Sequence, residues 1–141
     1  MTEVCRRRIA VAIIEQDGKF LITQRKSDGP FANLWELPGG KCEEGEQPAD
    51  CVVREVQEET GMRVIPEVCG FVIEHAYLEY TVEIHVFFCR AGEGTPSCGA
   101  SQALAWIGWD EINHYSFPAA NQLLFAQASI FRKRRESEVR A

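Results

Sequence analysis

Apolar residues fall along this chain in two patterns, one typical of strands and one of helices. Short runs rich in β-branched and aromatic residues, bounded by turn residues, predict strands. Asp17-Gly18 separates the first two runs and is typical of a tight hairpin turn. The predicted strands span residues 8–15, 19–25, 68–76, 81–90 and 104–107.

Helical patterns predict one helix at residues 48–60, a short helical turn at 110–113, and a last helix from Pro118 to about Arg134. Pro48 suits a first helical turn, where its missing N–H costs nothing, and Gly61 is a natural C-terminal stop. Each helix has an apolar face. The predicted faces are Ala49, Val52, Val53 and Val56 in the first helix, and Ala120, Leu123, Leu124, Gln127 and Phe131 in the last.

Strands and helices mix along the chain, and neither repeats nor low-complexity tracts interrupt them. This mixture predicts an α+β fold. A length of 141 residues with 45% hydrophobic content suits one globular domain with a real core. We therefore expect a single domain over residues 1–141, with a short basic C-terminal tail from about residue 132.

The net charge and the cysteine pattern limit the classes of binding partner and the cellular compartment that we expect. The net charge of −6 argues against polynucleotide binding, although Arg6–Arg8 and Arg132–Arg135 form basic clusters. No apolar run reaches membrane-spanning length. The six cysteines form no CxxC pair, so we expect free thiols in a reducing cytoplasm. Basic residues before the first apolar run suggest a signal peptide, but that run ends at Glu15 without a small-residue cleavage site, which favours a strand.

The first predicted helix carries a crowded acidic face. Glu55 and Glu59 are four residues apart, and Glu55 and Glu58 three apart, so the three carboxylates share one side of the helix. They repel one another unless cations lie between them, and hard oxygen ligands suit Mg²⁺ or Mn²⁺. A solvated surface helix is the alternative interpretation. Such a helix does not need the preceding Leu37-Pro38-Gly39-Gly40 loop, whose glycines let backbone carbonyls approach an ion closely.

The spacing of fixed residues across this region resembles a known signature, the Nudix box. Its matching positions are Gly40, Glu46, Arg54, Glu55, Glu58, Glu59 and Gly61, with Val56 and Met62 in the apolar slots. The resemblance implies the Nudix fold, a mixed β-sheet between helices (α/β/α), and Mg²⁺-dependent hydrolysis of nucleoside diphosphates linked to another group, with Mn²⁺ as a possible substitute. It also implies metal ligands at Gly39, Glu55, Glu58 and Glu59. It further implies that the catalytic residues are Glu55, Glu58, Arg54 and Glu46, and that Arg54 orients Glu46 or Glu55.

Beyond the box, residues from about Ile9 to Gln127 look like a MutT-type Nudix hydrolase, a group that converts 8-oxo-dGTP to 8-oxo-dGMP and pyrophosphate. The resembling segments are the opening strand IAVAII, Thr23-Gln24-Arg25, the LPGGK sequence ending at Lys41, Trp106 and the FPAAN sequence ending at Asn121. The resemblance implies that Asn121 hydrogen-bonds an oxidised guanine, using its donor and its acceptor. The alternative is that Asn121 merely occupies the first turn of the last helix. The expected substrate contacts are Arg25, Leu37, Gly40, Lys41, Tyr77 and Asn121.

Besides Asn121, Arg25 and Tyr77 also have competing interpretations, and Leu37 departs from the family pattern. Arg25 is either a nucleotide contact or a solvated arginine at a strand end. Leu37 stands where the best-known relative has an aromatic residue, so stacking on a base there is lost or replaced. Tyr77 is a candidate aromatic for the pocket, with an ordinary strand-end core tyrosine as the alternative.

One departure from the family concerns the general base. Many members carry a further glutamate in the loop before the late strand, where this chain has Ala100, Ser101 and Gln102. The only acid of that loop, Glu93, comes too early. Either the box supplies the base or another carboxylate reaches in. The candidates are Glu43, Glu44, Glu79 and Glu83.

Two classes of function follow. The first is a nucleoside triphosphate pyrophosphohydrolase that acts on 8-oxo-dGTP, with CTP or modified dCTP, ADP-ribose and dinucleoside polyphosphates as alternative substrates. The second is a non-catalytic nucleotide-binding Nudix module, which would have no need of the complete set of carboxylates. We expect a nucleoside di- or triphosphate as partner, neither polynucleotide nor membrane, and a monomer or homodimer.

Overall fold

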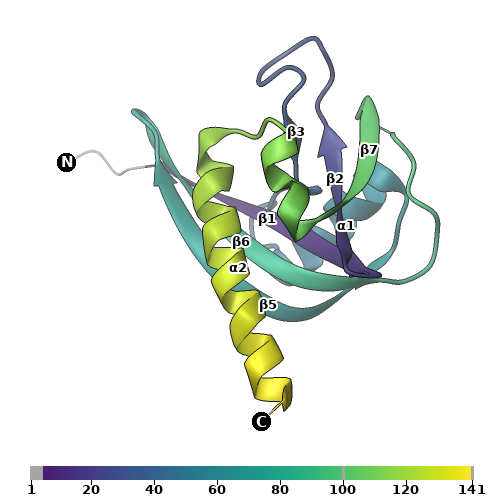
Figure 1. Ribbon diagram of the computed structural model, residues 1–141. Helices are drawn as coiled ribbons and strands as arrows, with labels where there is room; N and C mark the ends of the chain where they lie inside the picture. The colour runs from purple at the N-terminus through teal and green to yellow at the C-terminus, as the bar shows by residue number, and fades with distance from the viewer. Residues whose placement is uncertain (1–4, 100, 141) are drawn as a thin grey trace.

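The computed structural model describes residues 5–99 and 101–140 and is built on one mixed β-sheet (Figure 1). The strand order is β3-β2-β1-β6-β5, with β4 added beside β1 and β7 beside β2. Strand β1 runs antiparallel to β2 and β4 and parallel to β6. The strands are β1 Cys5–Gln16, β2 Lys19–Gln24, β3 Trp35–Glu36, β4 Gly39–Lys41, β5 Val64–Ala76, β6 Tyr80–Ala91 and β7 Ala103–Gly108.

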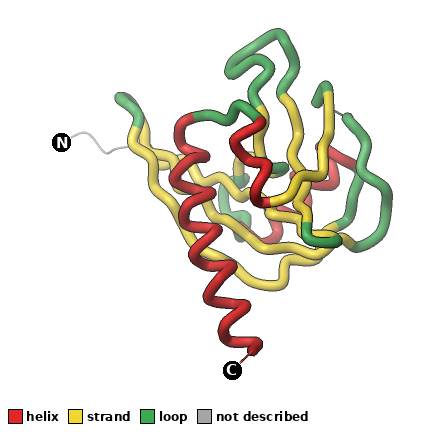
Figure 2. The backbone as a smooth tube through the Cα atoms, viewed as in Figure 1, coloured by secondary structure: helices red, strands yellow, loops and turns green. Residues whose placement is uncertain are grey.

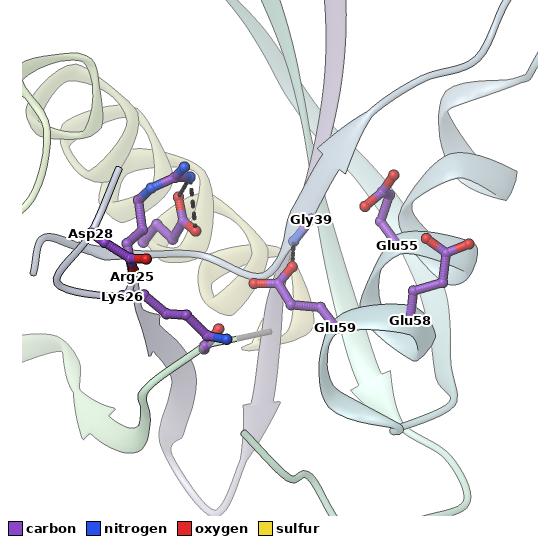
Figure 3. Close-up of a pocket in the computed structure, with 9 residues that line it drawn as sticks. Arg25, Lys26, Asp28, Gly39, Glu55, Glu58 and Glu59 are labelled. Atoms are coloured by element: carbon purple, nitrogen blue, oxygen red, sulfur yellow. Dashed lines mark hydrogen bonds and ion pairs between the residues drawn. The ribbon is translucent and has the colours of Figure 1, made fainter. Parts of the chain in front are cut away.

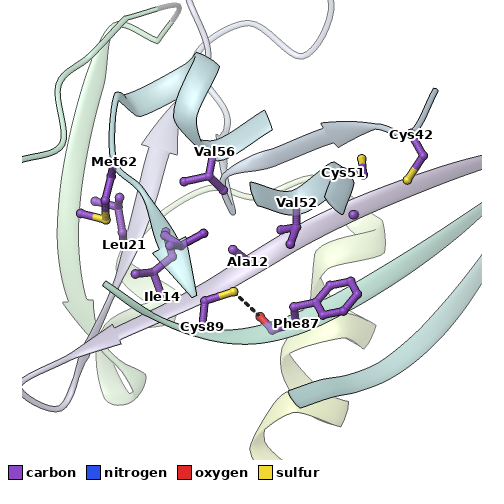
Figure 4. Close-up of a cluster of buried hydrophobic side chains, with 12 residues drawn as sticks. Ala12, Ile14, Leu21, Cys42, Cys51, Val52, Val56, Met62, Phe87 and Cys89 are labelled. Carbon is purple, nitrogen blue, oxygen red and sulfur yellow. Dashed lines mark hydrogen bonds between the residues drawn. The ribbon is translucent and has the colours of Figure 1, made fainter. Parts of the chain in front are cut away.

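Helix α1 (Pro48–Thr60) packs on one face of the sheet (Figure 4). Its buried residues are Cys51, Val52, Val56 and Thr60, whereas Ala49 is exposed. The predicted apolar face was thus correct for Val52 and Val56 and wrong for Ala49, because the helix turns Cys51 inward instead. Alternate residues of β1 and β2 meet this helix, among them Ala12, Ile14 and Leu21.

Helix α2 (Ala119–Arg140) packs on the opposite face, together with the short 3₁₀ helix η1 (Trp109–His114). Its core residues are Leu124, Phe125 and Ala128, while Leu123 is half exposed and Gln127 is exposed. The predicted stripe of this helix was therefore partly wrong. The helix also continues to Arg140, so the residues predicted as a tail from about 132 extend the helix (Figure 2).

The two helices on opposite faces confirm the α/β/α layers. None of the helices in the described ranges is long and apolar enough to cross a membrane. The cysteines whose side chains the structure describes are all free thiols, as predicted: Cys42, Cys51, Cys89 and Cys98.

Two strands escaped prediction, β3 and β4, because they are only 2 and 3 residues long and carry no alternating pattern of their own. Strand β5 begins at Val64 rather than at residue 68, because register shifts beside Pro66 and Gly70 interrupt its pattern. The short strand β4 matters for function. Its pairing with β1 holds Gly39 and Gly40 opposite Val11 and Ala10.

Candidate active site

A pocket of about 420 Å³ opens between α1, the end of β2 and the segment that follows β2 (Figure 3). Glu55 and Glu58 of α1 lie on one side of it, and Arg25, Lys26 and Asp28 lie on the other (Figure 3). Glu59 and Gly39 lie between the two sides. The pocket therefore brings an acidic wall together with a wall of mixed charge, where Arg25 and Lys26 lie beside Asp28 and Glu36. The full lining is Arg25, Lys26, Asp28, Glu36, Gly39, Glu55, Glu58, Glu59 and Ser101.

Helix α1 carries the acids of the pocket, and the local sequence fixes both ends of this helix. Pro48 occupies the first turn, and Gly61 ends the helix in the left-handed region at φ 75°, with its N–H donating to the Gln57 carbonyl. Glu58 is mostly exposed, whereas the Glu55 side chain is only 22% exposed. The acidic face therefore runs from Glu58, which is exposed to solvent, to Glu55, which is largely buried at the pocket.

Arg54 ties the acids of the box together. Its Nε and Nη2 donate to the two Glu46 oxygens at 2.8 and 2.9 Å, a bidentate pairing. Its Nη1 donates to Glu55 at 2.9 Å and to Glu58 at 3.2 Å. The hydrogen bonds from Arg54 lower the pKa of Glu46 to about 2. Arg54 thus contacts both Glu46 and Glu55, and its role in orienting them stays a prediction.

Glu59 is held separately from the other two acids of the face. One of its oxygens accepts from the Thr23 hydroxyl at 3.1 Å, and the other accepts from the Gly39 N–H at 3.2 Å (Figure 3). Burial raises the pKa of the Glu59 carboxyl to about 7. Glu59 is therefore half buried against β2 and β4, unlike the exposed Glu58.

Close contacts require the absence of a side chain at Gly39 and Gly40 of β4. A Cβ at Gly39 would overlap the Ala10 carbonyl oxygen of β1, and a Cβ at Gly40 would overlap the Glu55 carboxylate. The absence of side chains lets β4 pass between β1 and the acidic face. The backbone of the loop consequently lies within reach of any ion held there.

The donor set suits a hard divalent cation, although the side chains are not gathered around one point. Among the described residues, no three His, Cys, Asp or Glu side chains cluster closely enough to hold a metal ion. Arg54 holds Glu55 and Glu58, while Thr23 and Gly39 hold Glu59. Carboxylate oxygens beside a backbone without Cβ atoms are nevertheless the ligands that Mg²⁺ prefers.

Sequence reasoning missed several residues at the Arg25 end of the pocket. Glu36 faces Arg25, whose Nη1 lies 3.3 Å from its Oε2, and burial raises the pKa of Glu36. The Arg25 Nε donates to the Pro30 carbonyl at 3.0 Å, which fixes the guanidinium at the pocket wall. The position of Glu36, immediately before the LPGG sequence, was the available signal for its role.

Five predicted substrate contacts lie outside the pocket lining: Leu37, Gly40, Lys41, Tyr77 and Asn121. Leu37 is 4% exposed and packs in the core beneath α2, so the prediction of a contact by its side chain was wrong. Tyr77 lies in the turn between β5 and β6, stacked on Tyr80. Lys41 lines a different groove with Arg6 and Arg8. Asn121 lies in the first turn of α2.

The loop that lacks the family glutamate reaches the pocket through other residues. Ser101 lines the pocket, and the Gln102 amide donates to the Asn33 side chain at 2.7 Å. Ala100 lies outside the described residues. Glu93 uses its backbone carbonyl to accept from the Arg63 N–H and does not line the pocket. The pocket lining also lacks the alternative bases Glu43, Glu44, Glu79 and Glu83.

Comparison with known proteins agrees with this geometry. The chain matches the family model of the NUDIX domain over residues 9–127. It is 33% identical over 123 residues to the 8-oxo-dGTP diphosphatase of Escherichia coli (strain K12), covering 85% of this chain and 94% of that protein. It is also 33% identical over 115 residues to the CTP pyrophosphohydrolase of the same strain, covering 80% and 84%. The solution structure of the E. coli ORF135 protein matches with a TM-score of 0.81 at 28% identity, covering 94% of each chain.

These likenesses extend over nearly the whole chain rather than over the box alone. The matched residues 9–127 include every strand that forms the pocket and the beginning of α2. The predicted fold, a mixed sheet between helices, is confirmed by the solved structure of similar topology. The chain therefore belongs to the Nudix hydrolase family, as a member of MutT type.

Proposed function

We propose that this protein is a Mg²⁺-dependent nucleoside triphosphate pyrophosphohydrolase. One observation carries the proposal: the acidic face of α1 and the cations Arg25 and Lys26 line a single pocket, with Gly39 between them. A nucleotide laid across this pocket would place its phosphates near the acids, which would hold divalent cations there, and would extend its nucleoside toward Arg25 and Glu36. The relatives named as nucleotide diphosphatase and pyrophosphohydrolase support the same reaction class.

The residues that line and support the pocket would have different roles in such a reaction. Glu55, Glu58, Glu59 and the Gly39 carbonyl would hold Mg²⁺, which lowers the pKa of bound water and neutralises phosphate charge. Arg54 keeps Glu55 oriented through its 2.9 Å contact, and its pairing with Glu46 fixes the guanidinium itself. Arg25 and Lys26 supply positive charge at the other wall of the pocket. Glu55 is the proposed base, because the loop before β7 offers no carboxylate within the pocket.

The test is release of pyrophosphate by the purified protein with Mg²⁺. Glu58→Gln should lower kcat by roughly two orders of magnitude or more, since a charge aimed at the transition state is lost. The fold should survive, because the Glu58 side chain is 62% exposed. Glu67→Gln, an exposed acid of β5 away from the pocket, is the matched control. Wild-type turnover in Glu58→Gln at saturating Mg²⁺ contradicts the proposal, and no turnover in the wild-type protein supports a non-catalytic binding module.

For the substrate we propose 8-oxo-dGTP, which would give the protein a role in sanitising the nucleotide pool. The 8-oxo-dGTP diphosphatase relative and the FPAAN sequence support this choice. CTP is the second candidate, because the CTP pyrophosphohydrolase relative is equally identical. A panel of canonical, oxidised and sugar-linked nucleotides, scored by kcat/KM, separates them. Preference for CTP over 8-oxo-dGTP would reject the first choice and leave the reaction class intact.

Asn121 offers a residue-level test of the substrate. The Trp35 N–H donates to the Ser116 carbonyl at 2.8 Å, so the segment before α2 is tied to β3, the strand that carries Glu36. If Asn121 reads the edge of an oxidised purine, Asn121→Ala should cost about 1–3 kcal/mol in transition-state binding of 8-oxo-dGTP. The ratio of kcat/KM for 8-oxo-dGTP and dGTP should fall, with little change for dGTP. An unchanged ratio makes Asn121 a structural residue.

A further inference from the structure

Thr23 is a buried polar residue at the edge of the pocket. Its exposed fraction is 0%, and its hydroxyl donates to the Glu59 Oε1 at 3.1 Å. It belongs to β2, where it is two residues beyond Leu21 and therefore faces the α1 side of the sheet. A buried hydroxyl is favourable only while it is hydrogen-bonded, so the contact with Glu59 accounts for a threonine inside this core.

The backbone of Thr23 is fixed from both sides. It pairs with Glu36 of β3 on one side and with Leu104 of β7 on the other. The Gly39 N–H, which donates to the second Glu59 oxygen at 3.2 Å, comes from β4. Two different strands of the sheet thus direct one carboxylate of the helix. The Gly39 N–H is held by the pairing of β4 with β1, and the Thr23 backbone is held by β3 and β7, so both supports of the Glu59 carboxylate come from the sheet.

We infer that Thr23 is a positioning residue for divalent-cation binding, acting through Glu59. The inference rests on the proposed function, because it assumes that Glu59 binds the cation. Each Glu59 oxygen keeps further lone pairs beyond the one used by Thr23 or Gly39. Glu55 and Glu58 are oriented by Arg54 instead, so the acidic face has two independent supports. Loss of the Thr23 hydroxyl should free Glu59 while leaving the Arg54 contacts in place.

The experiment compares substitutions that remove the Thr23 hydroxyl with one that keeps it. Thr23→Val keeps the shape of the side chain and removes the donor, whereas Thr23→Ser keeps the donor. Binding of Mn²⁺ to the full chain without nucleotide, followed by electron paramagnetic resonance, gives a readout independent of turnover. We expect Thr23→Val to weaken Mn²⁺ binding by about ten-fold and Thr23→Ser to remain close to the wild type. Thr23→Ala paired with Thr23→Ser repeats the comparison if the valine variant does not fold.

A double-variant cycle separates positioning from a general loss of stability. In a Glu59→Gln background, Thr23→Val should have no further effect on Mn²⁺ binding, because the carboxylate it positions is already absent. An equal loss in both backgrounds overturns the inference, and so does wild-type Mn²⁺ affinity in Thr23→Val. Absence of Mn²⁺ binding to the wild-type protein overturns the proposed metal dependence and this inference with it. Wild-type binding with an unaffected Thr23→Val variant overturns the inference alone.

Discussion

Alanine substitutions at Gly39 and Gly40 of β4 should separate the geometry of the site from the stability of the fold. A Cβ at Gly40 would overlap the carboxylate of Glu55, which is the end of a flexible side chain. The carboxylate moves aside, and its 2.9 Å contact with Arg54 is lost. The backbone of β4 stays in place, so we expect the free energy of unfolding of Gly40→Ala to change by less than about 1 kcal/mol.

Gly39→Ala meets backbone instead of a side chain. Its Cβ would overlap the Ala10 carbonyl oxygen and lie 2.7 Å from the Val11 Cα, and the residue has a φ of +153°. Strand β1 cannot retreat, because it is paired with β2, β4 and β6. Overpacking of this kind, with added backbone strain, costs about 3 kcal/mol. For a chain of this length that cost lowers Tm by roughly 10 °C.

Two measurements on the same preparations decide the question. Thermal unfolding followed by circular dichroism gives Tm, and pyrophosphate release at saturating Mg²⁺ gives kcat. Gly40→Ala should keep Tm within a few degrees and lose roughly 100-fold in kcat, because a carboxylate aimed at the reacting phosphate is displaced. Gly39→Ala should show the large fall in Tm. Wild-type kcat in Gly40→Ala, or wild-type Tm in Gly39→Ala, would refute the reasoning.

The remaining predictions concern the stability of the fold at acid pH, the loop before β7 and the packing of α2 on the sheet. Arg54 lowers the pKa of Glu46 to about 2, so the stability from this pair is complete above the ordinary value of 4.5 and is lost as the pH falls through 2. Urea unfolding of Glu46→Gln should therefore depend less on pH between these values, and an equal dependence contradicts the assignment. Glu93→Gln should retain wild-type turnover, since its side chain does not line the pocket, and a large loss with intact folding would mean that the loop is misplaced. Leu124→Ala should lose about 2–5 kcal/mol in urea unfolding, whereas the half-exposed Leu123→Ala should lose less than about 0.5 kcal/mol, and similar losses would contradict the observed face of α2.

The sequence predicted those elements that carry their own pattern. The first hairpin formed as expected, because apolar runs flank the Asp17-Gly18 turn. Helix α1 spans the predicted residues, because Pro48 and Gly61 mark its ends locally. The face of α2 was harder to predict because Leu123, Leu124 and Phe125 are all apolar and adjacent. Only packing against the sheet decides which of them turn inward.

The site residues also divide into those predicted from local spacing and those whose contacts depend on the sheet. The helical spacing predicted that Glu55, Glu58 and Glu59 share a face, and the structure places all three at one pocket. It did not predict that Glu59 is held by β2, because Thr23 is distant in sequence and the contact depends on the sheet. Leu37 was misassigned because a resemblance transfers positions without transferring burial.

The parallel pairing of β1 with β6 has a consequence for the order of folding. Residues from Cys5 to Glu15 pair with residues from Tyr80 to Arg90, so one long edge of the first strand has no partner until more than half of the chain has been synthesised. Pairing between such distant segments closes a large loop and slows folding. During that interval the apolar IAVAII segment is an open edge that favours association with other nascent chains. The β1–β2 hairpin pairs only Glu15 and Gln16 of β1, and β4 pairs only Ile9 to Val11, which makes the arrival of β6 the step that commits the chain to its native sheet.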